Sequence, residues 1–288
     1  MDFHLLRTHS KLRSAKLIMV VMFALAAHAL AGNSTPNEPT LRPNDLLRQA
    51  VANEKLSAND GYFAWMDRLQ KPRGSATKLM VSTPQGILSR TMAINDRSLT
   101  PDERKQDDDR INRLLDPEKM RDKASKQRED QQHIERMLVA LPDAFHCEYS
   151  NAAHDDHNLH LECSPNPRFS PPNYESQILQ GMKAVILVNR EDCRITSIQG
   201  TLFKDVTFGW GFLGKLNSGG SIEITQSKMA GRHWGIQRMK LSFDGRIIFL
   251  KPLHLEETET SWDYRSVPGM TVAQALEYLR NSGPKASH

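Results

Sequence analysis

The sequence predicts an α+β fold built on one large antiparallel sheet, and three observations favour this class. From Asp143 onward, short runs of alternating apolar and polar residues follow one another. No helical crossover separates these runs, so consecutive strands should pair in antiparallel fashion. Amphipathic segments also stand before the first strands and after the last, and a strongly charged helical segment at 100–141 interrupts the strands.

Residues 1–31 have the composition of a signal peptide. Four basic residues precede an apolar block from Leu17 to Ala31, which ends on the small-x-small motif Ala29-Leu30-Ala31 that a signal peptidase recognises. The block is shorter than the roughly 20 residues of a membrane-spanning helix. We therefore expect cleavage after Ala31 instead of an uncleaved anchor, and a periplasmic mature chain with no transmembrane anchor. No cysteine follows the cut to accept a lipid.

Charge and motif content exclude several function classes. The chain carries a formal net charge of +4, of which the leader holds +3 through four basic residues and Asp2. The nearly neutral mature chain lacks the electrostatic footprint of a nucleic-acid-binding protein, so we expect no nucleic-acid partner. No GxSxG, HExxH, P-loop or dinucleotide motif occurs, and the sequence therefore predicts neither an enzyme nor a cofactor.

The chain after the leader begins with a predicted flexible linker at 32–43, which contains three prolines and almost no apolar side chain. The remaining residues, 44–288, form one predicted domain. Asn44 should cap a short helix whose apolar stripe lies on the sheet. The stripe comprises Leu46, Leu47, Ala50 and Val51, and the strands predicted next are 61–69, 76–83 and 87–95, the last two joined by Pro84-Gln85-Gly86.

The helical insertion at 100–141 begins with a strong start signal, Thr100 as N-cap followed by Pro101. Asp116-Pro117 repeats the signal, so one helix should end near residue 115 and another begin at once. Nearly every residue from Arg121 to Gln132 is charged or an amide, which predicts an arm that projects into solvent. A partner-binding arm and a solvated insertion both fit this pattern. The helix should return to the core at Ile134, Met137, Leu138 and Leu141.

The second half of the chain reads as a series of strands joined by hairpins. Turn residues stand at 190–192 and 231–232, and Asp244-Gly245 is the strongest hairpin signal. A short amphipathic helix at 270–279 follows the last strand. The predicted strands are 144–149, 158–163, 182–189, 193–203, 221–229, 234–243, 246–255 and 257–267.

Two cysteines should form a disulfide. If Ser150 pairs with His160, Cys147 and Cys163 lie opposite each other on neighbouring strands, and an oxidising compartment would join them. Cys193 then has no cysteine to pair with, and we expect it to be a small buried apolar residue rather than a reactive thiol. A bridge that uses Cys193 instead remains open at this point.

The same hairpin is rich in histidines and carboxylates that could hold zinc or copper. Their spacing matches no known metal motif, and His157 and His160 would face opposite sides of a strand. We therefore expect a solvated hairpin tip and predict no metal. Whether the hairpin binds zinc or copper is a question for a binding test. The histidines are His146, His154, His157 and His160.

An apolar stripe in the segment 205–220 is the candidate ligand-binding site. Phe208, Trp210 and Phe212 share one strand face, Leu213 follows them, and glycines stand between them. Such a stripe lines an apolar cavity or fills the core at a bend, and the sequence leaves both interpretations open.

The predicted helices and strands, taken in their order along the chain, resemble a family of uncharacterised exported bacterial proteins seen chiefly in Acidobacteria. The resemblance covers nearly the whole mature chain and is most specific in LTPDERKQDDDRINRLLDP, ALPDAF, NPRFSPP and DVTFGWGFLG. More distantly, an exported antiparallel sheet behind an N-terminal helix is similar to the LolA/LolB/RseB lipoprotein-carrier superfamily. That similarity implies a large curved sheet, a half-barrel that closes over helices around an apolar cavity for acyl chains. No ligand-binding residue of that superfamily matches a position in this chain.

The resemblance implies a soluble periplasmic protein that binds lipid, or a lipidated protein, in an apolar cavity without a chemical step. Each buried methylene contributes about 0.8 kcal/mol, so such a carrier needs no catalytic motif. The alternative is an envelope protein–protein scaffold or a stress-sensing module that uses the helical arm.

Overall fold

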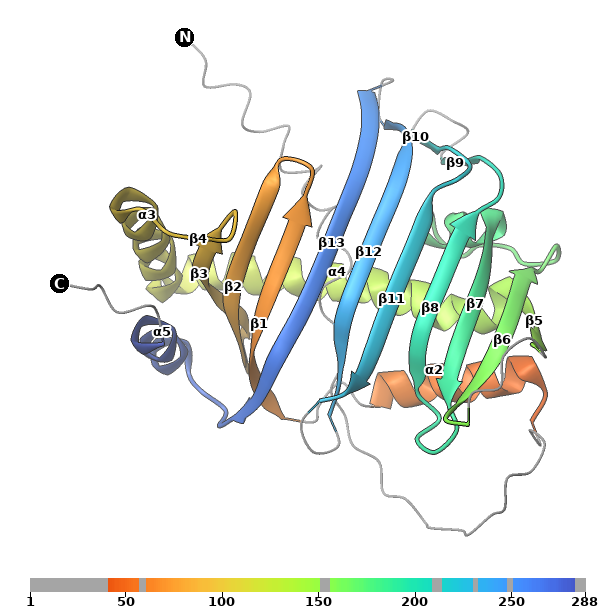
Figure 1. Ribbon diagram of the computed structural model, residues 1–288, viewed down its shortest axis with the longest axis horizontal. Helices are drawn as coiled ribbons and strands as arrows, with labels where there is room; N and C mark the ends of the chain where they lie inside the picture. The colour runs from red at the N-terminus through yellow and green to blue at the C-terminus, as the bar shows by residue number, and fades with distance from the viewer. Residues whose placement is uncertain are drawn as a thin grey trace.

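The computed structural model describes residues 41–56, 61–150, 156–208, 214–229, 233–247 and 251–282. Its centre is one open antiparallel sheet in the order β4-β3-β2-β1-β13-β12-β11-β8-β7-β6-β5, with β9 and β10 joined to β12 at one end (Figure 1). This confirms the predicted α+β class. The strands are β1 (Tyr62–Lys71), β2 (Gly74–Thr83), β3 (Gly86–Ile94), β4 (Arg97–Ser98), β5 (Phe145–Tyr149), β6 (Asn158–Pro165), β7 (Met182–Asn189), β8 (Ile195–Leu202), β9 (Val206–Phe208), β10 (Gly214–Leu216), β11 (Ser221–Lys228), β12 (Trp234–Ile247) and β13 (Lys251–Val267).

Helices cover different parts of this sheet. The first helix, α2 (Pro43–Leu56), lies near β5 to β8, and α4 (Pro117–Ala144) runs behind the strands along the length of the sheet (Figure 1). The last helix, α5 (Val272–Asn281), lies on the opposite side near β1 to β3. The remaining helical elements are α3 (Pro101–Asn112) and the 3-10 helices η2 (Arg113–Leu115) and η3 (Glu175–Gly181).

Two hydrophobic cores result, one on each face. The first joins the predicted stripe of α2 to the end of α4 and to strands β5 to β8. The second joins α5 to β1, β2 and β3, together with Ile111 of α3 and Met120 of α4. Neighbouring residues of β1 point to opposite faces, so Ala64 belongs to the second core while Asp67 is buried on the other face.

The helical insertion does not project into solvent, which corrects the predicted arm. Its polar side chains instead cover the free edge of β3. Gln127 accepts a hydrogen bond from Ile87 N–H at 3.0 Å and donates one to Ile87 C=O at 3.0 Å, as a neighbouring strand would. Lys123 donates to the same carbonyl at 2.5 Å, and Arg110 of α3 donates to Ser89 C=O at 2.7 Å. Edge strands with unpaired backbone groups invite association with other chains, and these contacts occupy the groups.

The opposite edge of the sheet is covered in the same way, and here too a sequence prediction is wrong. Asn44 is not the cap of α2, which begins one residue earlier at Pro43. Its side chain accepts a hydrogen bond from Cys147 N–H at 2.9 Å and donates to Phe145 C=O at 2.7 Å on β5. The amide thus satisfies a sheet edge that lies 101 to 103 residues away in the sequence, instead of its own helix.

A buried ion pair fixes α2 to the sheet. The side chain of Glu54 is fully buried and accepts hydrogen bonds from Arg194 at 2.7 Å, from Ile195 N–H at 2.7 Å and from Gln226 at 3.0 Å. Burial raises the pKa of the Glu54 carboxyl, and Arg194 opposes that shift. The contact joins α2 to β8 and β11.

The predicted disulfide is confirmed. Tyr149 pairs with Leu161, and Ser150 N–H donates to His160 C=O at 2.9 Å, which is the predicted register. Cys147 and Cys163 therefore lie directly opposite and are bonded, with a Cα–Cα distance of 4.1 Å. The alternative bridge to Cys193 is thereby excluded.

The hairpin predicted at Asp244-Gly245 is wrong, because both residues lie inside β12. Gly245 pairs with Leu253 of β13 and also with Leu216 of β10. A side chain at this position would overlap the backbone carbonyl of Lys215. The glycine therefore permits the close approach of a third strand and makes no turn.

Candidate functional site

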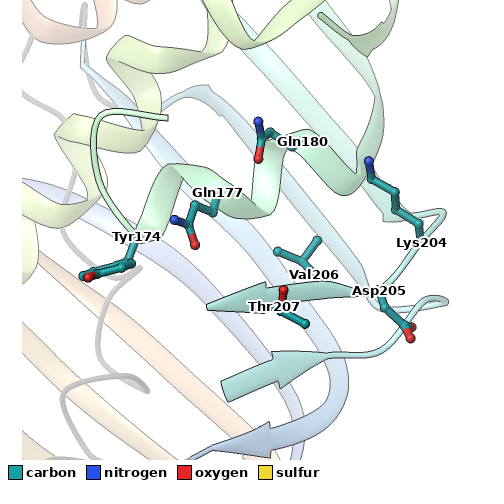
Figure 2. A pocket seen from close by; sticks show the side chains of 7 residues that line it. All are labelled: Tyr174, Gln177, Gln180, Lys204, Asp205, Val206 and Thr207. Atoms are coloured by element: carbon teal, nitrogen blue, oxygen red, sulfur yellow. The ribbon is translucent and has the colours of Figure 1, made fainter. Parts of the chain in front are cut away.

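A surface groove of about 460 Å³ opens between η3 and β9. Gln177 and Gln180 lie on η3 on one side of it, and Val206 and Thr207 of β9 on the other (Figure 2). Lys204 and Asp205 close one end, and Tyr174 lies at the other end. Its side chains are mostly polar, and its volume is within the range of small-molecule sites.

The two walls of the groove are fixed in place by local contacts that leave no recognisable pattern in the sequence. Asn173, two residues before η3, accepts a hydrogen bond from Ser176 N–H at 2.9 Å. The other end of η3 is fixed to the segment after β8, since Phe203 N–H donates to Gly181 C=O at 2.9 Å. Gly181 is required there, because a side chain at this position would overlap Val206 of β9.

Charge in the groove is unevenly compensated. The Lys215 ammonium, 2.6 Å away, holds the pKa of the Asp205 carboxyl below its usual value, and Ser218 N–H donates to the same side chain at 2.8 Å. Lys204 has no carboxylate within 4.0 Å among the described residues. The amide oxygen Oε1 of Gln177 is buried and accepts no hydrogen bond within the same set of residues.

Only part of the predicted ligand-binding stripe can be located. Phe208 ends β9 and is half-buried, and its side chain packs against the first hydrophobic core. Trp210, Phe212 and Leu213 lie outside the described residues, and their role stays a prediction. The stripe therefore begins at the strand that forms one wall of the groove.

A buried polar cluster occupies the sheet face that carries the first core. Met239 pairs with Glu259 and Phe243 pairs with Leu255 along β12 and β13, so Glu259 lies on the same face as Phe243. Burial, together with the neighbouring Asp67, raises the pKa of Glu259 to about 9. Asp67 accepts a hydrogen bond from the Ser261 hydroxyl at 2.9 Å.

The cluster is not an accessible reaction site. Asp67 and Glu259 are 6% and 7% exposed, and Ser261 is buried to the same degree. Burial also lowers the pKa of the neighbouring Lys78. These groups make the middle of this face polar, which disfavours an acyl chain at that place.

The described part of the histidine-rich hairpin gathers no group of three or more metal-binding side chains. His146 and His157 are exposed and His160 is half-buried, while His154 lies outside the described residues. Cys193 is a free cysteine that packs against the first core, although it is half-buried and not buried as predicted. Burial raises the pKa of its thiol to about 11, so little thiolate forms at neutral pH.

Sequence reasoning did not find the groove. Tyr174, Gln177 and Gln180 were in no predicted element, because a short 3-10 helix carries no apolar periodicity. The one available signal was Asn173 three residues before Ser176, a spacing typical of a turn at a helix start.

Comparisons with known proteins add little. No family model and no curated protein matches the chain. A solved structure, the crystal structure of a LolA superfamily protein from Nitrosomonas europaea, matches at 11% sequence identity and a TM-score of 0.27. The match covers 80% of this chain and 96% of that chain. The fold class rests on the sheet topology of this chain. None of the helices in the described ranges is long and apolar enough to cross a membrane.

Proposed function

We propose that this protein is a periplasmic carrier that binds a lipid, or the acyl chain of a lipidated protein, without a chemical step. The placement of the groove carries the proposal. The groove lies against β9, and β9 leads directly into the apolar stripe formed by Phe208, Trp210, Phe212 and Leu213. A polar groove whose wall strand is followed in the sequence by apolar residues suits an amphiphile, because its headgroup and chain need different surroundings.

The buried polar cluster determines where the acyl chain would lie. Hydrocarbon gains nothing beside Asp67 and Glu259, so the chain would lie against Phe208 and the first core at the β9 end of the sheet. Burial of a sixteen-carbon chain would yield about 13 kcal/mol before the costs of ordering are subtracted. Apolar contact alone is therefore sufficient for binding.

Two features support export. Residues 1–31 have the composition of a leader that is cleaved after Ala31, and the Cys147–Cys163 disulfide is a bond that persists in oxidising compartments. We propose a linker at 32–43 ahead of a single domain at 44–288. The mass of the protein purified from the periplasm would establish the cleavage site.

Native mass spectrometry of the same sample tests the carrier function. We expect a co-purifying lipid, and uptake of a fluorescent fatty acid by the delipidated protein. The double variant Trp210→Ser/Phe212→Ser should lose most of that uptake. Trp262→Ser is the control, because Trp262 is exposed on the sheet face opposite Glu259. A lipid-free mass together with no uptake would refute the proposal.

The predicted helical arm does not support the scaffold alternative. Lys123 and Gln127 belong to the segment Arg121 to Gln132 and are bonded to the edge of β3. Deletion of that segment should therefore unfold the protein, whereas a detachable partner-binding arm would be lost without harm to the fold.

A further inference from the structure

Two lysines lie near the exposed ring of Phe203, and one of them, Lys204, also lines the groove. The ring of Phe203 has the ammonium of Lys183 at 5.8 Å and that of Lys204 at 5.6 Å from its centroid. Phe203 is 47% exposed, although large aromatic side chains are usually buried. We call Lys183, Phe203 and Lys204 the basic rim.

Within the described residues, no acidic side chain neutralises the positive charge of the basic rim. Neither ammonium has a carboxylate within 4.0 Å among the residues that the structure describes. Asp205, the acidic residue next to Lys204, is already paired with Lys215 at 2.6 Å. Lysines in this state lose little on binding an anion, because they give up no internal ion pair.

The interior of the groove offers a different group, a free hydrogen-bond acceptor. Oε1 of Gln177 is buried and unpaired within the described ranges, which is costly unless a donor occupies the groove. Gln180 is already committed, since its amide donates to Phe169 C=O at 3.1 Å. The groove therefore pairs a cation at its end with an unsatisfied acceptor inside.

We propose that the basic rim and the groove bind the phosphoglycerol headgroup of an anionic phospholipid. The phosphate accepts hydrogen bonds from Lys183 and Lys204, and a glycerol hydroxyl donates to Oε1 of Gln177 once a rotation of that side chain exposes the atom to the groove. This inference rests on the proposed carrier function and names the ligand class. Exposed Phe203 and Tyr174 favour a lipid over a free phosphate compound, because aromatic rings at a surface suit the interface between headgroups and acyl chains.

Binding of the mature protein to phosphatidylcholine vesicles that contain phosphatidylglycerol tests the basic rim. Lys183→Gln/Lys204→Gln should weaken binding roughly 25-fold, at about fivefold per lysine near an anionic surface. The control is Lys119→Gln/Lys126→Gln, which removes the same charge from two exposed lysines on α4. Equal binding by the two double variants would overturn the proposal. If the rim variant does not fold, the single variants Lys183→Gln and Lys204→Gln each have to show the fivefold loss.

The acceptor has its own test. Phosphatidylmethanol carries the phosphate but no hydroxyl, so the wild-type protein should prefer phosphatidylglycerol. Gln177→Leu should abolish that preference while binding to phosphatidylmethanol is kept. An unchanged preference in the variant would contradict the assigned role of Gln177.

Two further measurements separate the possible failures. If the protein binds soluble glycerol 3-phosphate through the two lysines but does not bind vesicles, the ligand is a free phosphate compound and the proposal of a lipid is refuted. If the protein takes up fatty acid but the rim variant binds phosphatidylglycerol vesicles as well as the wild type does, this inference is refuted and the carrier function stays intact. A protein that binds neither would refute both.

Discussion

Replacement of Glu54 by alanine tests whether the buried ion pair fixes α2 to the sheet. The variant removes a fully buried carboxylate and leaves Arg194, which is itself 6% exposed, without that counter-charge. Removal of one partner from a buried ion pair costs about 3 to 5 kcal/mol. For a chain of this size, that loss should lower Tm by roughly 6 to 20 °C.

The assay is urea unfolding followed by circular dichroism, with Lys55→Ala as the matched control. Lys55 is the next residue of α2 and pairs with Glu135 of α4 at 3.0 Å, but both side chains are more than 40% exposed. An exposed pair contributes about 0.2 to 1 kcal/mol. The two variants therefore remove neighbouring ion pairs of the same helix, of which only the Glu54 pair is buried and supported by further hydrogen bonds from Ile195 and Gln226.

A second substitution identifies the cause of the loss. If the loss of the carboxylate beside Arg194 is responsible, Glu54→Met/Arg194→Met should be more stable than Glu54→Ala, because it removes both charges and fills the space. Loss of less than 1 kcal/mol in Glu54→Ala would refute the reasoning. A double variant less stable than the single one would show that Arg194 contributes mainly through other contacts, such as the Trp234 ring 5.6 Å away.

Three further predictions concern pH and the disulfide. Because the folded protein keeps a proton on Glu259 up to pH about 9, while the unfolded chain releases it near 4.5, wild-type stability should fall as pH rises between these values. Glu259→Gln should flatten that dependence in urea titrations, and an equal slope in both proteins would contradict the assignment. Burial lowers the pKa of His233 to about 4, so stability should be lost as pH falls from 6.5 towards 4. NMR should show His233 titrating near pH 4. The exposed His254, which is paired with Asp244 at 2.7 Å, should titrate above 6.5. A His233 midpoint near 6.5 would be inconsistent with its burial. Replacement of Cys147 and Cys163 by serine should cost about 3 kcal/mol for a sequence separation of 16, and unchanged stability would exclude the disulfide in solution.

Local patterns were sufficient to predict most of the strands. The range 182–189 was predicted and is observed as β7, because alternation and the turn at 190–192 define both the strand and its end. The cysteine register followed from the same alternation. The long strands β12 and β13 were predicted as three shorter ones, since Asp244-Gly245 is typical of a turn and the sequence gives no sign that β10 approaches there.

The position of α4 could not be predicted for a different reason. Its contacts with the sheet are made by Lys123 and Gln127 to backbone atoms of Ile87, and such contacts leave no apolar periodicity. A run of charged residues then has the same appearance as a solvated helix. The groove escaped detection likewise, because Gln177 and Lys204 come from a 3-10 helix and a bend that only tertiary contacts bring together.

The two capped edges restrict how a partner can bind. Asn44 presents a carboxamide to β5, the outer strand, and Gln127 presents one to the part of β3 that the short strand β4 leaves unpaired; each offers the donor and acceptor that a neighbouring strand would supply. A partner that adds a strand to β5 or β3 would first have to displace these side chains and leave their polar groups unpaired, at a cost of about 1 to 3 kcal/mol for each buried group. Recognition through strand addition is therefore disfavoured at both ends of the sheet. The groove beside η3, with the lysines of the basic rim, is the more favourable place for a ligand, because among the described residues neither lysine has an ion pair to give up.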